Sequence, residues 1–295
     1  MPALLCFGMG YCAEALAARL KPAGWRILGT ARSAERIGEL ADRGWKACTF
    51  GDIEASGILA EPDLHLLASA PPDEAGDPVL RAFGHRLGAA AGTMAWAGYL
   101  STTGVYGDRQ GDWVDEDSAL EPQSERGRRR VEAERDWLRW GEATGLPVNV
   151  FRLAGIYGPG RNQLETLRAG TARCIVRQGQ VFSRIHVDDI ASVLQAAMSR
   201  RRPGRVYNVC DDEPAPPHEV VRFAANLLGM DAPPLEDFET ARATLSPMAA
   251  SFYGESKRVR NDRMKAELGV SLAWPTYREG LSALRRTLDD VKPAG

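Results

Sequence analysis

The sequence is short of several features that mark particular classes of protein. None of its hydrophobic runs approaches the roughly 18 residues that a membrane-spanning helix needs. Its five cysteines are scattered and form no Cys-x-x-Cys pair, and its four histidines show no ligand spacing, so neither disulfides nor a metal site is expected. The 37 basic and 39 acidic residues leave a net charge of −2, so no global field favours nucleic acid or an anionic membrane. An apolar run beginning at Ala3 leaves no room for a signal peptide, and we expect a cytoplasmic location.

The sequence does contain a regular alternation of short apolar runs and helix-like segments, which is typical of a parallel sheet covered on both faces. The pattern predicts strands over 3–7, 26–30, 45–50, 64–69, 97–102, 148–153 and 205–210. It predicts helices over 12–21, 34–43, 78–91, 124–144, 188–200 and 217–228. The pattern is looser over 230–251, where we expect a small lobe. The predicted fold class is therefore α/β.

A glycine-rich turn follows the first predicted strand and opens the first helix. Residues 8–13 read GMGYCA, a G-x-G-x-x-A match in the strand–turn–helix setting that dinucleotide binding requires. Gly8 permits the tight turn, Gly10 lets backbone amides approach a pyrophosphate, and Ala13 allows close helix packing, with Tyr11 beside them at the helix start. The alternative is a glycine-rich turn without a ligand. The motif favours a Rossmann-type doubly wound parallel sheet with a small C-terminal substrate lobe.

The end of the second strand indicates which dinucleotide is bound. Residues 29–33 read GTARS and contain no acidic residue, whereas an NAD enzyme carries Asp or Glu there to hold the ribose 2′-hydroxyl. Arg32 beside Ser33 suits a 2′-phosphate, so we predict NADP, with NAD as the alternative; a solvated Arg32 is the other interpretation. Asp52, after the third strand, is a candidate to accept a hydrogen bond from the adenine amino group or is a plain turn aspartate.

Four further motifs occur in order along the chain: TTGVYGD at 102–108, RLAGIYGPG at 152–160, IHVDDIA at 185–191 and YNVC at 207–210. With the glycine-rich turn, they resemble the extended short-chain dehydrogenase/reductases, the NAD-dependent epimerase/dehydratase family. The resemblance runs along most of the chain and implies a dinucleotide-binding core over 1–158, continued by 180–212. It implies a smaller substrate lobe over 159–179 and 213–295. Four motifs in this order are specific for the fold and not for the activity.

The family's catalytic roles are only partly matched. The resemblance gives Thr102 the role of the residue that hydrogen-bonds the reacting oxygen. Arg126 takes the place of the catalytic tyrosine, and Arg130 that of the lysine that holds the nicotinamide ribose. A guanidinium keeps its proton at any working pH, so Arg126 cannot perform a tyrosine's acid/base role. Gly155 and Phe182 stand where nucleotide-sugar enzymes of the family carry an Asn and an Arg, which argues against a nucleotide-sugar substrate.

The two arginines suggest a different use of this helix. Arg126 and Arg130 are four residues apart and share a helical face, from which two guanidiniums would bind a carboxylate or phosphate. The alternative is a solvated surface, which we favour for Arg128 and Arg129. In the family this helix, Ser124 to Thr144, often contributes to a dimer interface, so the resemblance implies a possible homodimer.

The missing tyrosine leaves the proton donor to be found elsewhere. Tyr106, at the end of the active strand, is the preferred candidate, although a packed aromatic is the commoner fate of such a residue. Asp108 and His186 are others, and a loop–helix histidine such as His186 more often makes a structural bond. Residues 253–257 read YGESK, a literal Y-x-x-x-K, but they lie far beyond the strand that carries Thr102, so we predict no catalytic role for them.

Two functions of different classes are consistent with this sequence. The first is an NADP-dependent oxidoreductase or epimerase/dehydratase that acts on a small anionic substrate, with Thr102, Arg126 and Arg130 in its site and Tyr106 or water moving the proton. The second is a non-catalytic module that binds NADP(H) and senses the cofactor pool, which the missing tyrosine suggests. Most members of such a fold are enzymes, and on that analogy we favour the first.

Overall fold

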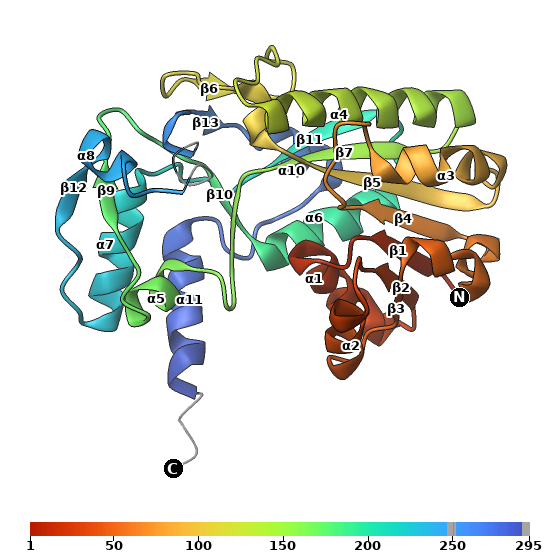
Figure 1. Ribbon diagram of the computed structural model, residues 1–295, viewed down its shortest axis with the longest axis horizontal. Coiled ribbons are helices and arrows are strands. Elements are labelled where there is room, and N and C mark those ends of the chain that lie inside the picture. Colours follow the sequence, from red (N-terminus) through yellow and green to blue (C-terminus); the bar gives the residue numbers. More distant parts are fainter. Residues whose placement is uncertain (247–249, 251, 291–295) are drawn as a thin grey trace.

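The computed structural model describes residues 1–246, 250 and 252–290. Its centre is a seven-stranded sheet in the order β11-β7-β5-β4-β1-β2-β3, in which every neighbouring pair is parallel (Figure 1). The strand order reverses between β1 and β4, and ligands bind at this switch point in sheets of this kind. The strands are β1 (Ala3–Phe7), β2 (Arg26–Thr30), β3 (Ala47–Cys48), β4 (Leu64–Ala68), β5 (Met94–Thr102), β7 (Val148–Leu153) and β11 (Arg205–Val209).

Helices cover both faces of this sheet, which is why its central strands β1 and β4 are buried along their whole length. On one face α1 (Tyr11–Leu20) packs against α6 (Val187–Arg200). On the other, α3 (Pro78–Ala89) packs against α4 (Glu125–Thr144) (Figure 1). The helix α2 (Ala34–Asp42) contacts β3 at the sheet edge and lies on the same face as α1, where Leu40 joins the α1 cluster. This arrangement confirms the predicted Rossmann-type α/β fold.

The apolar side of α4 packs against other elements of the same chain. Trp137 is fully buried and stacks on Tyr99 of β5, with ring centroids 6.0 Å apart. Trp140 meets Trp137 edge-on at 5.6 Å and donates from its indole nitrogen to the Gly84 carbonyl of α3 at 3.0 Å. The tryptophans therefore hold α4 against the sheet and α3, and a homodimer through this helix stays a prediction.

A second apolar cluster lies beside the sheet, built by α5 (Gln163–Arg168), α7 (Pro217–Leu228) and α11 (Tyr277–Asp290) (Figure 1). Short parallel strand pairs join it to the core: β8 (Gly155–Tyr157) with β10 (Arg184–His186), β9 (Cys174–Val176) with β12 (Leu235–Asp237), and β6 (Trp113–Val114) with β13 (Arg258–Val259). The helix α8 (Phe238–Arg242) follows β12. The division into core and lobe remains a prediction, and α10 (Asp262–Leu268) departs from it by burying Met264 and Leu268 in a core cluster of the main sheet.

The predicted strands and helices are all present, but two strands differ clearly in their bounds and the helices α5, α10 and α11 were not predicted. The strand β5 begins at Met94, three residues before the predicted start at 97, and the strand predicted over 45–50 is shorter. Where we expected a strand over 45–50, β3 ends at Cys48 and Phe50 starts the short 3₁₀ helix η2 (Phe50–Asp52). The reason is packing: the Phe50 ring lies 5.3 Å from that of Phe7 and 5.7 Å from that of Phe83, which turns the chain inward. The remaining 3₁₀ helices are η1 (Lys21–Ala23), η3 (Glu54–Ser56), η4 (Ile58–Ala60) and η5 (Thr103–Tyr106). None of the helices in the described part of the chain is long and apolar enough to cross a membrane.

Candidate functional site

The glycine-rich turn has the geometry of an anion cradle. Gly8 adopts φ of 91°, which favours glycine, and its amide donates to the Thr30 hydroxyl at 2.9 Å. Gly10 begins α1 without a side-chain cap, so the first-turn amides of α1 are left for a ligand. A Cβ built at Gly10 meets nothing within 4 Å, so its lack of a side chain keeps open space in front of these amides. The residues present therefore fit the pyrophosphate of a dinucleotide.

This turn opens into a cavity of about 620 Å³ at the carboxyl ends of the central strands. Gly10 follows β1, Ser69 follows β4, Thr102 ends β5, and Ala154 follows β7, and all four line it. Because parallel strands end at one edge of the sheet, residues far apart in sequence meet here. Its walls also include Tyr11, Cys12, Ala13, Ser101, Thr103, Ser124, Arg126, Arg130, Arg161, Phe182, Ser183, Arg184, Tyr253, Glu255 and Lys257.

Thr102, Arg126 and Arg130 are brought together at this cavity, as the sequence pattern predicts. The Thr102 hydroxyl oxygen accepts from the Gly104 amide at 3.1 Å, which leaves its proton for another acceptor. Arg126, in the first turn of α4, is exposed and has no recorded hydrogen bond or ion pair among the described residues. Arg130 is 8% exposed and donates to the Leu100 carbonyl, while its Nε is buried without a partner.

The neighbouring arginines of α4 point elsewhere. Arg128 pairs with Glu125 at 2.8 Å, and Arg129 pairs with Glu74 and Glu125, each at 3.3 Å. Neither lines the cavity. Arg128 and Arg129 thus lie on the outer surface of α4, as expected. They face away from Arg126 and Arg130 because the helix repeats every 3.6 residues.

Tyr106 does not reach the cavity, so the structure corrects the expectation that it moves a proton there. Its ring is fully buried, and its hydroxyl donates to Asn208 Oδ1 at 2.7 Å and accepts from Arg152 at 2.9 Å. Burial raises the pKa of this phenol to about 12. The cause is the turn of η5, which points Tyr106 into the core after Thr102 has ended the strand.

His186 serves the fold in the same way. Its ring is 2% exposed and its Nδ1 accepts from the Asp188 amide at 3.2 Å, so it caps the start of α6. Burial lowers its pKa, and the neutral imidazole needed for this cap is favoured. Asp108 is likewise engaged, because its carboxylate accepts from the Ser256 amide at 2.8 Å.

The predicted adenosine-side residues lie outside the cavity. Arg32 is exposed after β2 and has no recorded partner among the described residues. Ser33 caps α2, with its hydroxyl oxygen accepting from the Arg36 amide at 3.2 Å. Asp52 is exposed and accepts from the Thr49 hydroxyl at 2.6 Å, which is the behaviour of a turn aspartate. Arg32 is therefore free to meet a 2′-phosphate, while Ser33 and Asp52 already have local partners.

Several cavity residues were not anticipated from the sequence. Arg161, Arg184 and Lys257 add three positive charges to those of Arg126 and Arg130, and Glu255 supplies the one carboxylate among the described lining residues. Burial lowers the pKa of the Arg184 guanidinium, while the nearby Asp211 opposes this. Arg184 directly precedes the IHVDDIA motif at 185–191, which was the signal available for it. Lys257 belongs to the Y-x-x-x-K stretch at 253–257, for which no catalytic role was predicted because it lies far from Thr102 in the sequence.

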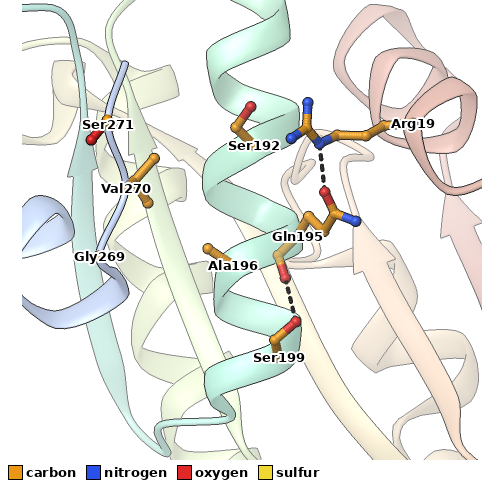
Figure 2. A pocket seen from close by; sticks show the side chains of 8 residues that line it. All are labelled: Arg19, Ser192, Gln195, Ala196, Ser199, Gly269, Val270 and Ser271. Carbon is orange, nitrogen blue, oxygen red and sulfur yellow. Dashed lines mark hydrogen bonds between the residues drawn. The ribbon is translucent and has the colours of Figure 1, made fainter. Parts of the chain in front are cut away.

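A second hollow lies between α1 and α6. It measures about 390 Å³ and includes Arg19, whose Nε donates to Gln195 Oε1 at 2.5 Å. Within α6, the Ser199 hydroxyl donates to the Gln195 carbonyl at 3.1 Å (Figure 2). None of the residues predicted for a site from the sequence lines this hollow, and we assign it no function.

The fold is of the Rossmann type, and comparisons with known proteins show what this chain is similar to. Residues 89–210 match the model of the NAD dependent epimerase/dehydratase family. The chain is 50% identical to a functionally unknown conserved protein from Silicibacter pomeroyi DSS, covering 98% of this chain and 100% of that one, with a TM-score of 0.87. The family match therefore covers residues 89–210, while the Silicibacter pomeroyi protein resembles the whole chain.

Two more distant similarities extend over most of the chain. The protein YeeZ of Escherichia coli K12 is 26% identical over 291 residues, covering 91% of this chain and 94% of its own. The structure of dTDP-glucose 4,6-dehydratase from Bacillus anthracis, solved in complex with NAD, superposes with a TM-score of 0.77 at 16% identity, over 99% of this chain and 98% of that one. At that identity the dehydratase shows the shared fold alone.

Proposed function

We propose that this protein is an NADP-dependent oxidoreductase or epimerase/dehydratase-type enzyme that acts on a small anionic substrate. The observation that carries the proposal is one continuous cavity, which joins the uncapped start of α1 to Thr102 and to five cationic side chains. With one carboxylate among the described lining residues, the wall is strongly positive, and a substrate that carries a carboxylate or phosphate fits it.

The chain offers specific positions for the cofactor. The amides around Gly10 suit the pyrophosphate, and the exposed Arg32 suits a 2′-phosphate because a guanidinium binds phosphate oxygens through paired N–H donors. The Bacillus anthracis dehydratase holds NAD in the same fold, so NAD is the alternative here. Arg32, and the absence of an acidic residue over 29–33, favour NADP.

The chain's own groups divide the remaining work. The Thr102 hydroxyl donates a hydrogen bond to the reacting oxygen of the substrate, since its own acceptor position is taken by the Gly104 amide. Arg126 anchors the substrate anion, and Arg130, which also lines the cavity, binds ribose hydroxyls or the same anion. When bound, the nicotinamide supplies or accepts the hydride.

Cofactor titration tests the first part of the proposal. NADPH and NADH are added separately to the purified protein, and energy transfer from tryptophan to the nicotinamide is followed. We expect micromolar NADPH binding and NADH binding about tenfold weaker, because Arg32 makes charge-assisted bonds to the 2′-phosphate. Equal affinities would remove the assignment of Arg32, and binding of neither would leave the glycine-rich turn without a ligand.

Anion binding tests the second part. Oxalate, a small dicarboxylate, is titrated into the NADPH-loaded protein by calorimetry, with Arg126→Ala compared against Arg128→Ala, which removes an arginine of the same helix outside the cavity. We expect Arg126→Ala to weaken oxalate at least tenfold and to retain NADPH affinity, and Arg128→Ala to change neither. Oxalate binding that is indifferent to Arg126 contradicts the anchoring role. Hydride transfer to any compound of an anionic carbonyl panel would exclude a purely sensing function.

A homodimer through α4 and a cytoplasmic location complete the proposal. The dimer rests on the family resemblance alone, because the Trp137 side of α4 is already packed inside the monomer. Light scattering at two protein concentrations distinguishes monomer from dimer.

A further inference from the structure

The stretch 253–257 lies at the same cavity as Thr102 and Arg126, although about 150 residues of sequence separate them. The connection runs through the loop that follows η5. Asp108 accepts from the Ser256 amide at 2.8 Å, and the amides of Arg109 and Gly111 both donate to the Ser256 carbonyl at 3.0 Å. The segment is therefore fastened directly to the end of the active strand, and its distance in sequence is no argument against a role.

A second set of bonds fixes the other side of this segment. The Ser256 hydroxyl donates to the Gly179 carbonyl at 3.0 Å and accepts from the Val181 amide at 3.1 Å. The Tyr253 carbonyl accepts from Arg177, and the Lys257 amide donates to the Val181 carbonyl at 3.3 Å. With both sides held, the side chains of Tyr253 and Lys257 have defined positions at the cavity wall.

Most groups at the cavity that carry a proton cannot give it to a substrate. The four guanidiniums do not deprotonate. Lys257 Nζ and Glu255 Oε2 lie 2.5 Å apart, both sheltered from solvent, so each is occupied by the other. Burial raises the pKa of the Cys12 thiol to about 11, and a thiol is a weak hydrogen-bond donor.

Aliphatic hydroxyls such as that of Thr102 can donate a hydrogen bond but are far weaker acids than a phenol, so the choice falls between the two phenols that line the cavity. Tyr11 donates its proton to the Pro159 carbonyl at 2.9 Å, so it is already committed. Tyr253 has no hydroxyl hydrogen bond recorded among the described residues, and it is half-buried. Its ring is stacked on Phe238 at 5.3 Å and meets Phe182 edge-on at 6.3 Å, which restrains it at the wall.

We propose that Tyr253 supplies the hydroxyl that Arg126 cannot, donating its proton to an oxygen of the bound anionic substrate. The inference rests on the proposed function. In the reductive direction, a substrate carbonyl carbon gains hydride from the reduced nicotinamide as the C=O double bond becomes a single bond. The carbonyl oxygen takes the Tyr253 proton, and the resulting phenolate regains a proton from water. In the oxidative direction these steps reverse: Tyr253 first loses its proton to water, and the phenolate then takes the alcohol proton as the alcohol carbon gives its hydride to the oxidised nicotinamide.

The surroundings of Tyr253 favour the protonated form at rest. Burial raises the pKa of this phenol above its ordinary value, and Arg173 and Arg184 oppose that effect by favouring the phenolate. A raised pKa means that the group is protonated throughout the neutral range, which is the state required of a donor. The positive charge of Arg184, which also lines the cavity, stabilises the phenolate that a transfer would leave.

The test compares Tyr253→Phe with Tyr277→Phe. The control removes a phenol hydroxyl from α11 that is buried, has no partner among the described residues and does not line the cavity. Oxalate binding to the NADPH-loaded protein is measured by calorimetry, and NADPH oxidation by pyruvate and phenylglyoxylate by absorbance. We expect Tyr253→Phe to bind NADPH as the wild type does, to bind oxalate about tenfold more weakly and to lose about a hundredfold in any hydride transfer. Tyr277→Phe should match the wild type in all three.

The oxalate and NADPH measurements distinguish failure of this inference from failure of the proposed function. Unchanged oxalate affinity in Tyr253→Phe overturns this inference, while the Arg126→Ala result and NADPH binding keep the proposed function standing. Loss of NADPH or oxalate binding in the wild type removes the proposed function and this inference with it. A measurement on the wild type guards against misfolding of the variant: oxalate should protect Tyr253 from acetylation by N-acetylimidazole, read by peptide mass spectrometry. Equal acetylation with and without oxalate also overturns the inference.

Discussion

The proposed cofactor side (residues 8–13 and, outside the cavity, Arg32) and the proposed substrate side (Thr102, Arg126, Arg184 and Tyr253) are built in opposite ways. The cofactor side uses one strand–turn–helix and the end of the adjacent strand, so its parts are close in sequence. The substrate side draws on β5, α4, β10 and the segment before β13, which are far apart along the chain. A short stretch of sequence can thus specify the proposed cofactor side, whereas the proposed substrate side depends on long-range packing.

The largest effect should come from a buried ion pair that supports the substrate side. Glu134 of α4 and Arg152 of β7 approach to 2.8 Å with side chains 3% and 5% exposed, and Ser101 donates to the same carboxylate. Glu134→Gln leaves the guanidinium buried without its counter-charge, so we expect a loss of about 3–5 kcal/mol in the free energy of unfolding. Urea denaturation measures it. A loss under 1 kcal/mol would mean that water or another group compensates Arg152.

The next largest effect is expected from Gly10→Ala, which changes the proposed cofactor side alone. Gly10→Ala adds a methyl group where the structure has open space, so the fold should be unaffected. The same methyl would occupy the approach of a pyrophosphate to α1, and we expect NADPH to bind at least tenfold more weakly with an unchanged thermal midpoint. Fluorescence titration and calorimetric unfolding check the two halves. Wild-type affinity in Gly10→Ala would place the pyrophosphate away from this turn.

A smaller and more selective effect is expected at Arg32. Arg32→Ala should weaken NADPH about tenfold and leave NADH unchanged, because only NADPH carries the phosphate that this exposed side chain would meet. Arg36 is a matched control, since it is already paired with Glu14 at 2.9 Å and Glu39 at 2.6 Å. Equal losses for both cofactors would point to a general electrostatic contribution from Arg32.

The smallest effect should be found on the outward side of α4. Glu125→Gln removes the partner of Arg128 and Arg129 in the same helix that carries Glu134, but its carboxylate is 60% exposed. Exposed pairs contribute little because water screens them, so the free energy of unfolding should change far less than in Glu134→Gln. Glu134→Gln is measured in the same urea series. The difference between the two losses in the free energy of unfolding shows how much burial adds to an ion pair on one helix. Equal losses in the two variants would contradict this expectation.

The limits of prediction follow from where each residue's partners lie. Strands β1, β2 and β7 and helix α7 begin and end where the hydrophobic pattern places them, because each pattern is set by its own residues. Tyr106 could not be placed in this way: whether it lines a cavity depends on η5, Asn208 and Arg152. Helix periodicity did separate Arg126 and Arg130 from Arg128 and Arg129, since that division depends on α4 alone.

The sequence by itself determined the α/β fold, the glycine-rich turn and the face that Arg126 and Arg130 share, because local periodicity and turn chemistry specify them. Only the tertiary structure decided that Tyr106 is buried and that Arg184, Lys257 and Tyr253 stand at the cavity. The physical reason is that parallel strands gather their carboxyl ends at one edge, and the hydrogen bonds of Ser256 bring a distant segment to that edge. No pattern of neighbouring residues encodes a contact of that kind.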